Sequence, residues 1–148
     1  MTVNIYIHQT IKGPGTRAGS YTYVLEADVN GKVATLTHTD ILEPMTEKKA
    51  ELIVILKALK RLVKQCDVMI VGCSLYLVTA VDQWLDNWLL HDWQNAKGRE
   101  IANKEEWQEL LEYIRKYRIT FVKECQHEYL YWMKSETEKA ERKRKDGI

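Results

Sequence analysis

Residues 46–74, TEKKAELIVILKALKRLVKQCDVMIVGCS, predict one helix followed by one buried strand. Apolar residues recur at helical spacing through 52–63, and Glu51 falls inside the same apolar arc. Residues 68–71 form a continuous apolar run, which is typical of a parallel strand covered on both faces. The run ends at 72–74, and α/β sheets commonly place their sites at such strand ends.

Glu51 requires a chemical explanation because a carboxylate on an apolar helix face is costly when it is isolated. Such a group must be neutralised, hydrogen-bonded or bound to a cation. The alternative is that Glu51 lies near the helix start, where the helix dipole favours negative charge and water is close. Both explanations stay open at this point.

The composition indicates one globular domain over residues 1–148. The chain is 45% hydrophobic and 29% charged, which is ordinary for a domain with a proper core. No apolar run is long enough to span a bilayer and no signal peptide is recognisable, so we expect a cytoplasmic protein without a membrane partner. The net charge of +1 gives no global attraction to nucleic acid.

Three cysteines, Cys66, Cys73 and Cys125, are an odd number and show no CxxC spacing. Neither a disulfide framework nor a self-contained zinc motif is therefore indicated. We expect free thiols.

Alternation and turn signals define the remaining elements. Predicted strands cover 3–9, 20–28, 32–39, 68–71 and 118–123. Asn30-Gly31 is a strong hairpin signal, and 40–45 is expected to be a loop. Thr46 is expected to cap a helix that runs to about residue 65.

The second half of the chain is predicted to be mainly helical. Ser74 is expected to cap a helix, and Asn103 with Glu106 forms a capping box for another. The last helix begins at about residue 127, and its charged end, about 135–148, is expected to be solvated.

This order of elements, and several local motifs, resemble type 1 ribonuclease H over almost the whole chain. The motifs are the glycine loop 13–21, Ala50-Glu51-Leu52, the tryptophans Trp84, Trp88, Trp93 and Trp107, and Thr120-Phe121-Val122-Lys123. The resemblance implies an α/β ribonuclease H-like fold, with a five-stranded mixed sheet of three antiparallel and then two parallel strands, flanked by helices.

The family's activity, as the resemblance implies it, is hydrolysis of the RNA strand of an RNA-DNA hybrid by two Mg²⁺ ions. Four clustered carboxylates hold these ions, because hard cations prefer anionic oxygen. The four positions fall on His8, Glu51, Cys73 and Ser135, with Glu136 next to the last. His127 lies where the family carries a mobile histidine.

Recognition positions of the family have also changed. The family places amides that touch the hybrid at positions that here hold Glu47, Lys48 and Lys49. A second region of the family, the handle, is basic in many members and contacts phosphates, but residues 89–92 at that place are Leu-Leu-His-Asp. The tryptophans are therefore interpreted as packing residues rather than as base-stacking residues.

The replacement of family carboxylates by His8 and Cys73 allows two further interpretations of the site. His8, Glu51 and Cys73 are a credible three-ligand zinc set. Alternatively the pocket is vestigial, and Glu51 pairs with His8 and favours its protonation.

We therefore expect a catalytically degenerate ribonuclease H-like protein that binds an unknown protein or nucleic-acid partner, or serves a structural role, without a cofactor. The first alternative is an active nuclease that cleaves RNA-DNA hybrids with Mg²⁺ at an atypical site. The second is a nucleic-acid-binding module that does not cleave. Its weak candidate contacts are Arg17, Lys48, Lys49, Lys97 and Arg99, with the basic run at 142–145.

Overall fold

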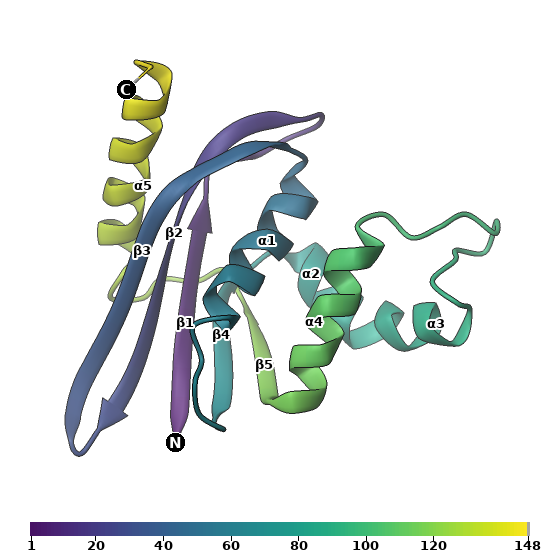
Figure 1. Cartoon of the computed structure of the whole chain (residues 1–148), viewed down its shortest axis with the longest axis horizontal. Helices are drawn as coiled ribbons and strands as arrows, with labels where there is room; N and C mark the ends of the chain where they lie inside the picture. The colour runs from purple at the N-terminus through teal and green to yellow at the C-terminus, as the bar shows by residue number, and fades with distance from the viewer. Residues whose placement is uncertain (148) are drawn as a thin grey trace.

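Five strands form one mixed sheet in a computed structural model that describes residues 1–147 (Figure 1). The strands are β1 (Thr2–Gln9), β2 (Arg17–Val29), β3 (Lys32–Met45), β4 (Asp67–Cys73) and β5 (Arg118–Lys123). Their spatial order is β3-β2-β1-β4-β5. The first three strands pair antiparallel, and β4 lies parallel to both β1 and β5. The predicted sheet is confirmed.

Helices cover both faces of this sheet (Figure 1). They are α1 (Glu47–Leu59), α2 (Leu75–Thr79), a π-helical turn η1 (Ala80–Trp84), α3 (Leu85–Leu90), α4 (Lys104–Lys116) and α5 (Leu130–Lys145). Side chains alternate between the faces of a strand, so neighbouring residues of β1 reach different helices. Ile5 and Ile7 belong to the core under α1, whereas Tyr6 packs with Met133 of α5. The helices α1 and α5 therefore lie on opposite faces.

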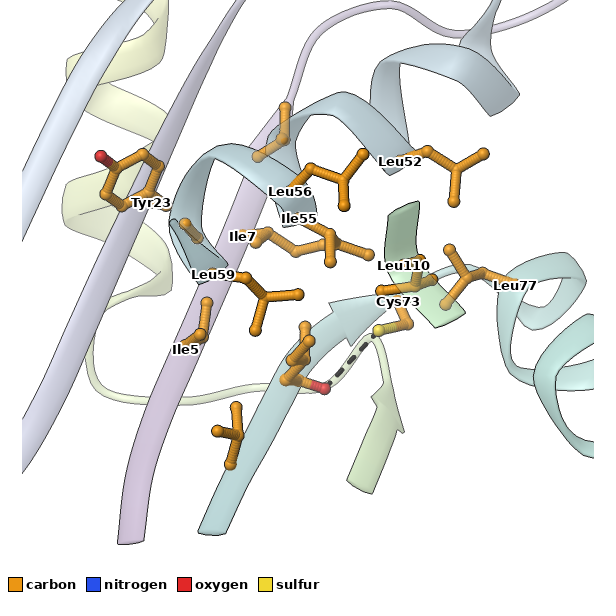
Figure 2. Packing of buried hydrophobic residues seen from close by; sticks show 14 of the residues in the cluster. Ile5, Ile7, Tyr23, Leu52, Ile55, Leu56, Leu59, Cys73, Leu77 and Leu110 are labelled. Atoms are coloured by element: carbon orange, nitrogen blue, oxygen red, sulfur yellow. Dashed lines mark hydrogen bonds between the residues drawn. The ribbon is translucent and has the colours of Figure 1, made fainter. Parts of the chain in front are cut away.

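The main core lies between α1 and the sheet. Figure 2 shows Leu52, Ile55 and Leu59 of α1 in this layer. These three side chains have no exposed surface, and the helical spacing of apolar residues in α1 places them on one face. Thr46 caps the helix as predicted, because its side chain accepts from the Lys49 N–H.

Two predicted boundaries were wrong. The segment 40–45 is the last part of β3 and not a loop, since pairing with β2 resumes after a bulge between Arg17 and Gly19. Pro44 is tolerated there because β3 is an edge strand. The helix α1 ends at Leu59 rather than near residue 65, and Val63 beyond it is 90% exposed.

The start of α4 also differs in detail from the prediction. Asn103 precedes the helix, but its φ of 60° places it in the left-handed region and its side chain makes no capping bond. The predicted capping box with Glu106 is therefore wrong, although the helix itself is confirmed.

The charged end of α5 is not simply a solvated tail. The Glu141 carboxylate accepts from Thr10 Oγ1 at 3.1 Å and from Ser20 Oγ at 2.8 Å. Thr137 hydroxyl lies 2.7 Å from that of Thr22 on β2. Polar contacts thus fix the second half of α5 on the sheet, which corrects the expectation for the part of 135–148 that lies within the described residues; Ile148 lies outside them.

Within residues 1–147, no helix combines the length and the apolar character needed to cross a membrane.

Candidate functional site

A cavity of about 460 Å³ opens where β1 and β4 end, beside the first turns of α1. The two strands are parallel, so their carboxyl ends meet at one edge of the sheet. Gly72 allows their close approach, because its φ is +107° and an added Cβ would lie 2.6 Å from the Ile7 carbonyl oxygen. The lining includes His8, Lys12, Glu51, Ser74, Glu124 and Lys134.

Glu51 is hydrogen-bonded through both of its carboxylate oxygens. Ser74 N–H donates to one oxygen at 2.6 Å, and Ser74 Oγ donates to the other at 2.6 Å. Burial raises the pKa of Glu51, and the two Ser74 bonds oppose that rise. Hydrogen bonding to Ser74 therefore explains how a carboxylate is tolerated on the apolar face of α1.

The same bonds connect α1 to the start of α2. Ser74 is the N-cap of α2, as predicted, since its Oγ accepts from the Leu77 N–H at 3.1 Å. Glu51 thus holds the capping residue of the next helix in place. The Glu51 carboxylate therefore has a structural role, since it fixes the start of α2 against α1.

His8 lines the same cavity, but its chemistry differs from the expectation. Burial, followed by the positive charges of Lys12 and Lys134, lowers the pKa of His8 to about 4. The expected His8–Glu51 pair, in which the carboxylate favours protonation, is therefore wrong, because Glu51 accepts hydrogen bonds from Ser74 instead. His8 is a neutral imidazole at neutral pH.

Cys73 belongs to the core and not to the cavity. Its side chain is fully buried, and the thiol donates to the Ile70 carbonyl at 3.5 Å (Figure 2). Burial raises the pKa of this thiol, so it stays protonated. The neighbouring residue, Ser74, reaches the cavity instead.

Glu136 also lies outside the cavity that contains His8 and Glu51. It borders a separate hollow between α5 and β3, and it contacts Lys139 at 3.5 Å. Residues two apart on a helix point in different directions, so Lys134 lines the cavity when Glu136 does not. Of the family positions His8, Glu51, Cys73 and Ser135, and the neighbouring Glu136, the cavity lining includes His8 and Glu51 alone.

Sequence reasoning missed three charged residues of the lining, Lys12, Glu124 and Lys134. Glu124 directly follows β5, which is parallel to β4 and ends at the same edge. That position was a usable signal. Lys134 carried none, because its direction depends on where α5 begins and on which face packs against the sheet.

The donor chemistry does not fit the metals considered from the sequence. Among residues 1–147, no three His, Cys, Asp or Glu side chains are grouped so that they can hold one metal ion. The zinc set of His8, Glu51 and Cys73 is thus not assembled. Two Mg²⁺ ions need several anionic oxygens, whereas here both Glu51 oxygens already accept from Ser74 and the Lys134 ammonium faces the same space.

The five basic residues proposed for nucleic-acid contact are divided among three segments of the chain. Arg17 donates to the Pro14 carbonyl at the start of β2. Lys48, beside Lys49 in α1, stands 4.2 Å from the ring centre of Tyr76. Lys97 and Arg99 lie in the loop between α3 and α4, which projects at the right of Figure 1. A contact role for them stays a prediction.

The tryptophans form a packed cluster, as interpreted from the sequence. Trp107 is fully buried, and its ring centre lies 5.3 Å from that of Trp88 in an edge-on arrangement. Trp88 also contacts Trp84, which is 39% exposed. His127 lines the cavity and packs 4.5 Å from Tyr6.

Comparison with known sequences places this arrangement in one family. Residues 3–130 match the family model for RNase H. The ribonuclease H of Francisella philomiragia subsp. philomiragia is 37% identical over 76 residues, which cover 51% of this chain and 50% of that protein. The chain spans about half the length of the curated relatives it matches.

Solved structures show the same fold. LC9-RNase H1, described as a type 1 RNase H with the type 2 active-site motif, matches with a TM-score of 0.75 and 16% identity, over 95% of this chain and 72% of that one. LC11-RNase H1, solved in complex with an RNA/DNA hybrid, matches with a TM-score of 0.65 and 17% identity, over 95% of this chain and 97% of that one.

Proposed function

This chain belongs to the ribonuclease H family, and we propose that it is a catalytically degenerate member that binds a partner or serves a structural role. The observation that carries the proposal is the state of Glu51. It is the one carboxylate of the four family positions that this sequence keeps in the cavity, and Ser74 engages both of its oxygens.

The charges around Glu51 support the same conclusion. In this family the cavity must attract cations, and anionic ligands do this. Here Lys12 and Lys134 bring ammonium groups to the lining, and both depress the pKa of His8. A bound Mg²⁺ ion would be repelled by the same charges. We therefore derive no hydrolytic step through a metal at this site.

The acidic residues Glu47 and Glu124 do not restore the lost ligands. Glu47 accepts from the Gly13 N–H at 2.9 Å and so holds the glycine loop against α1. Glu124 is exposed just after β5, and it is a single further carboxylate. One exposed acid beside a fixed one is fewer than two Mg²⁺ ions require.

Nucleic-acid binding without cleavage is the second candidate. Two observations favour it: the ammonium groups of Lys12 and Lys134 at the cavity, and the fold shared with LC11-RNase H1, which was solved with an RNA/DNA hybrid. Affinity that comes from phosphate contacts falls steeply with salt, whereas binding of an apolar protein surface does not.

The test is a binding and cleavage panel with RNA-DNA hybrid, duplex DNA, duplex RNA and single-stranded RNA. We expect no strand to be cleaved in Mg²⁺. Salt-sensitive binding that weakens in the double variant Lys12→Ala/Lys134→Ala, but not in the control Lys116→Ala at the exposed end of α4, would favour the second candidate. Mg²⁺-dependent cleavage that disappears in Glu51→Gln would contradict the proposal and establish an active nuclease with an atypical site.

A further inference from the structure

The strand β3 leaves one edge of the sheet open. It is 14 residues long and is the outermost strand of the sheet, whereas β5 at the other edge has 6 residues (Figure 1). Natural edge strands are usually protected by lysine, proline or a bulge. Residues 33–38 contain no Lys, Arg, Asp, Glu or Pro, and their pairing with β2 is unbroken. This part of β3 carries none of those protections.

The hairpin geometry shows which backbone groups face outward. Asn30 and Gly31 have φ values of 53° and 81°, and they join the paired residues Val29 and Lys32. In such a two-residue turn the flanking pair exchanges both backbone hydrogen bonds. Even-numbered residues of β3 therefore bond to β2 as far as the pairing is regular. The odd-numbered ones direct N–H and C=O away from the sheet: Val33, Thr35, Thr37 and Thr39.

Apolar surface lies beside this open edge. A groove of about 210 Å³ runs between β3 and the chain that follows α1. Leu36 lines it and is 40% exposed, and Val63 opposite is 90% exposed. Exposed apolar side chains next to unpaired backbone groups suit the addition of another strand.

We propose that a second copy of this chain is that partner, and that the two β3 strands pair antiparallel with their Leu36 side chains at the twofold axis. This register joins outward-facing groups to each other, because Thr35 meets the partner's Thr37 and Val33 meets the partner's Thr39. Leu36 then packs against its own copy, at the spacing of a cross-strand pair.

Charge complementarity selects this register. With Leu36 at the axis, Lys32 of each chain faces the partner's Asp40, so opposite charges meet twice. A register centred on Thr37 places Asp40 opposite the partner's Ala34, so that Asp40 keeps only His38 of its own chain, 3.7 Å away, and Lys32 meets no acidic residue. A register centred on His38 brings two histidines together. The Leu36 register alone matches both the backbone directions and the charges.

The helix α5 leaves residues 32–38 of β3 open to the partner. It borders β3 at Thr39, Asp40 and Ile41, on the face opposite α1. Residues 32–38 of β3 are all exposed. The contact is isologous, because both copies use the same strand edge. The two sheets therefore join into one, and the assembly stops at a dimer.

Sedimentation velocity over a range of concentrations tests the pairing. We expect a reversible monomer-dimer equilibrium. The charge reversals Lys32→Asp and Asp40→Lys should each weaken dimerisation by about tenfold or more, because like charges then meet at both ends of the ladder. The double variant Lys32→Asp/Asp40→Lys should restore the wild-type affinity, and circular dichroism of each variant controls for folding.

Amide hydrogen exchange gives an independent readout. The N–H groups of Thr35 and Thr37 should exchange rapidly at low concentration and become protected as the concentration rises, while those of Leu36 and His38 stay protected throughout. A chain that is monomeric at every concentration would overturn the proposal. A dimer whose affinity ignores the charge reversals, or whose exchange leaves Thr35 and Thr37 unprotected, would also overturn it.

Discussion

The helix α1 meets two different environments, and the contrast explains what this chain has kept. Leu52, Ile55 and Leu59 enter a dry apolar layer over the sheet. Glu51, on the same apolar side of the helix, reaches the cavity and is held by Ser74. The apolar layer determines the fold and depends on volume and shape. The cavity determines the chemistry, and its residues change without disturbing that layer.

The largest effect should come from the apolar layer. Leu59→Ala removes a fully buried side chain, and we expect it to lower the free energy of unfolding by about 3 kcal/mol. The exposed cavity residue provides the comparison, since Lys134→Ala should change that free energy by less than about 0.5 kcal/mol. Urea unfolding of both variants measures the difference. Equal losses in the two variants would show that the cavity contributes as much to the free energy of unfolding as the apolar layer does.

The boundary between the two regions should give an intermediate effect. Glu51→Leu leaves the Ser74 N–H and Oγ without their acceptor, so we expect a loss of about 2 kcal/mol in the free energy of unfolding. The two Ser74 bonds therefore argue against a stabilising effect of this change.

Ser74→Ala and the double variant complete a thermodynamic cycle for this pair. If the two residues act through each other, the double variant should cost less than the sum of the single variants. Strict additivity, or a gain in stability for Glu51→Leu, would refute the assigned role of Glu51.

A smaller effect should appear in the pH dependence of stability. The folded-state pKa of His8 is about 4, below the ordinary value of 6.5. Between these values the unfolded chain binds more protons, so the stability should fall as the pH is lowered through this window. We expect His8 to account for about 1 to 2 kcal/mol of that loss, after allowance for the exposed part of the ring.

His8→Gln should remove this part of the slope. Glu51 contributes to the pH dependence of stability with the opposite sign, because its raised pKa lets the folded state keep its proton to higher pH. This contribution cancels in the comparison, since wild type and His8→Gln both contain Glu51. Thermal melts of wild type and His8→Gln across the window isolate the histidine. Identical pH profiles for the two proteins would contradict the lowered pKa.

The sequence predicted the scaffold because its signals are local. Alternation in the strands, Asn30-Gly31 at the hairpin and the apolar stripe of α1 each depend on residues close together in the chain. The end of β3 escaped prediction because Pro44 suggests a loop, and only the pairing with β2 beyond the Arg17 bulge extends the strand.

The cavity was predicted only in part, for a physical reason. His8 and Glu51 follow from a strand end and from a helix stripe. Cys73 and Ser74 are adjacent, and which of them faces the cavity depends on the course of the chain as it leaves β4. The inward direction of Lys134 depends on how α5 docks, through Thr137 and its neighbours, on the far face of the sheet.

The central claim is that the cavity no longer supports metal-dependent hydrolysis. Single-turnover cleavage of an RNA-DNA hybrid in Mg²⁺, with protein in excess and with Glu51→Gln in parallel, tests it most directly. We predict that wild type and Glu51→Gln both give the background rate measured without protein. Wild-type cleavage above that background, dependent on Mg²⁺ and lost in Glu51→Gln, would contradict the account.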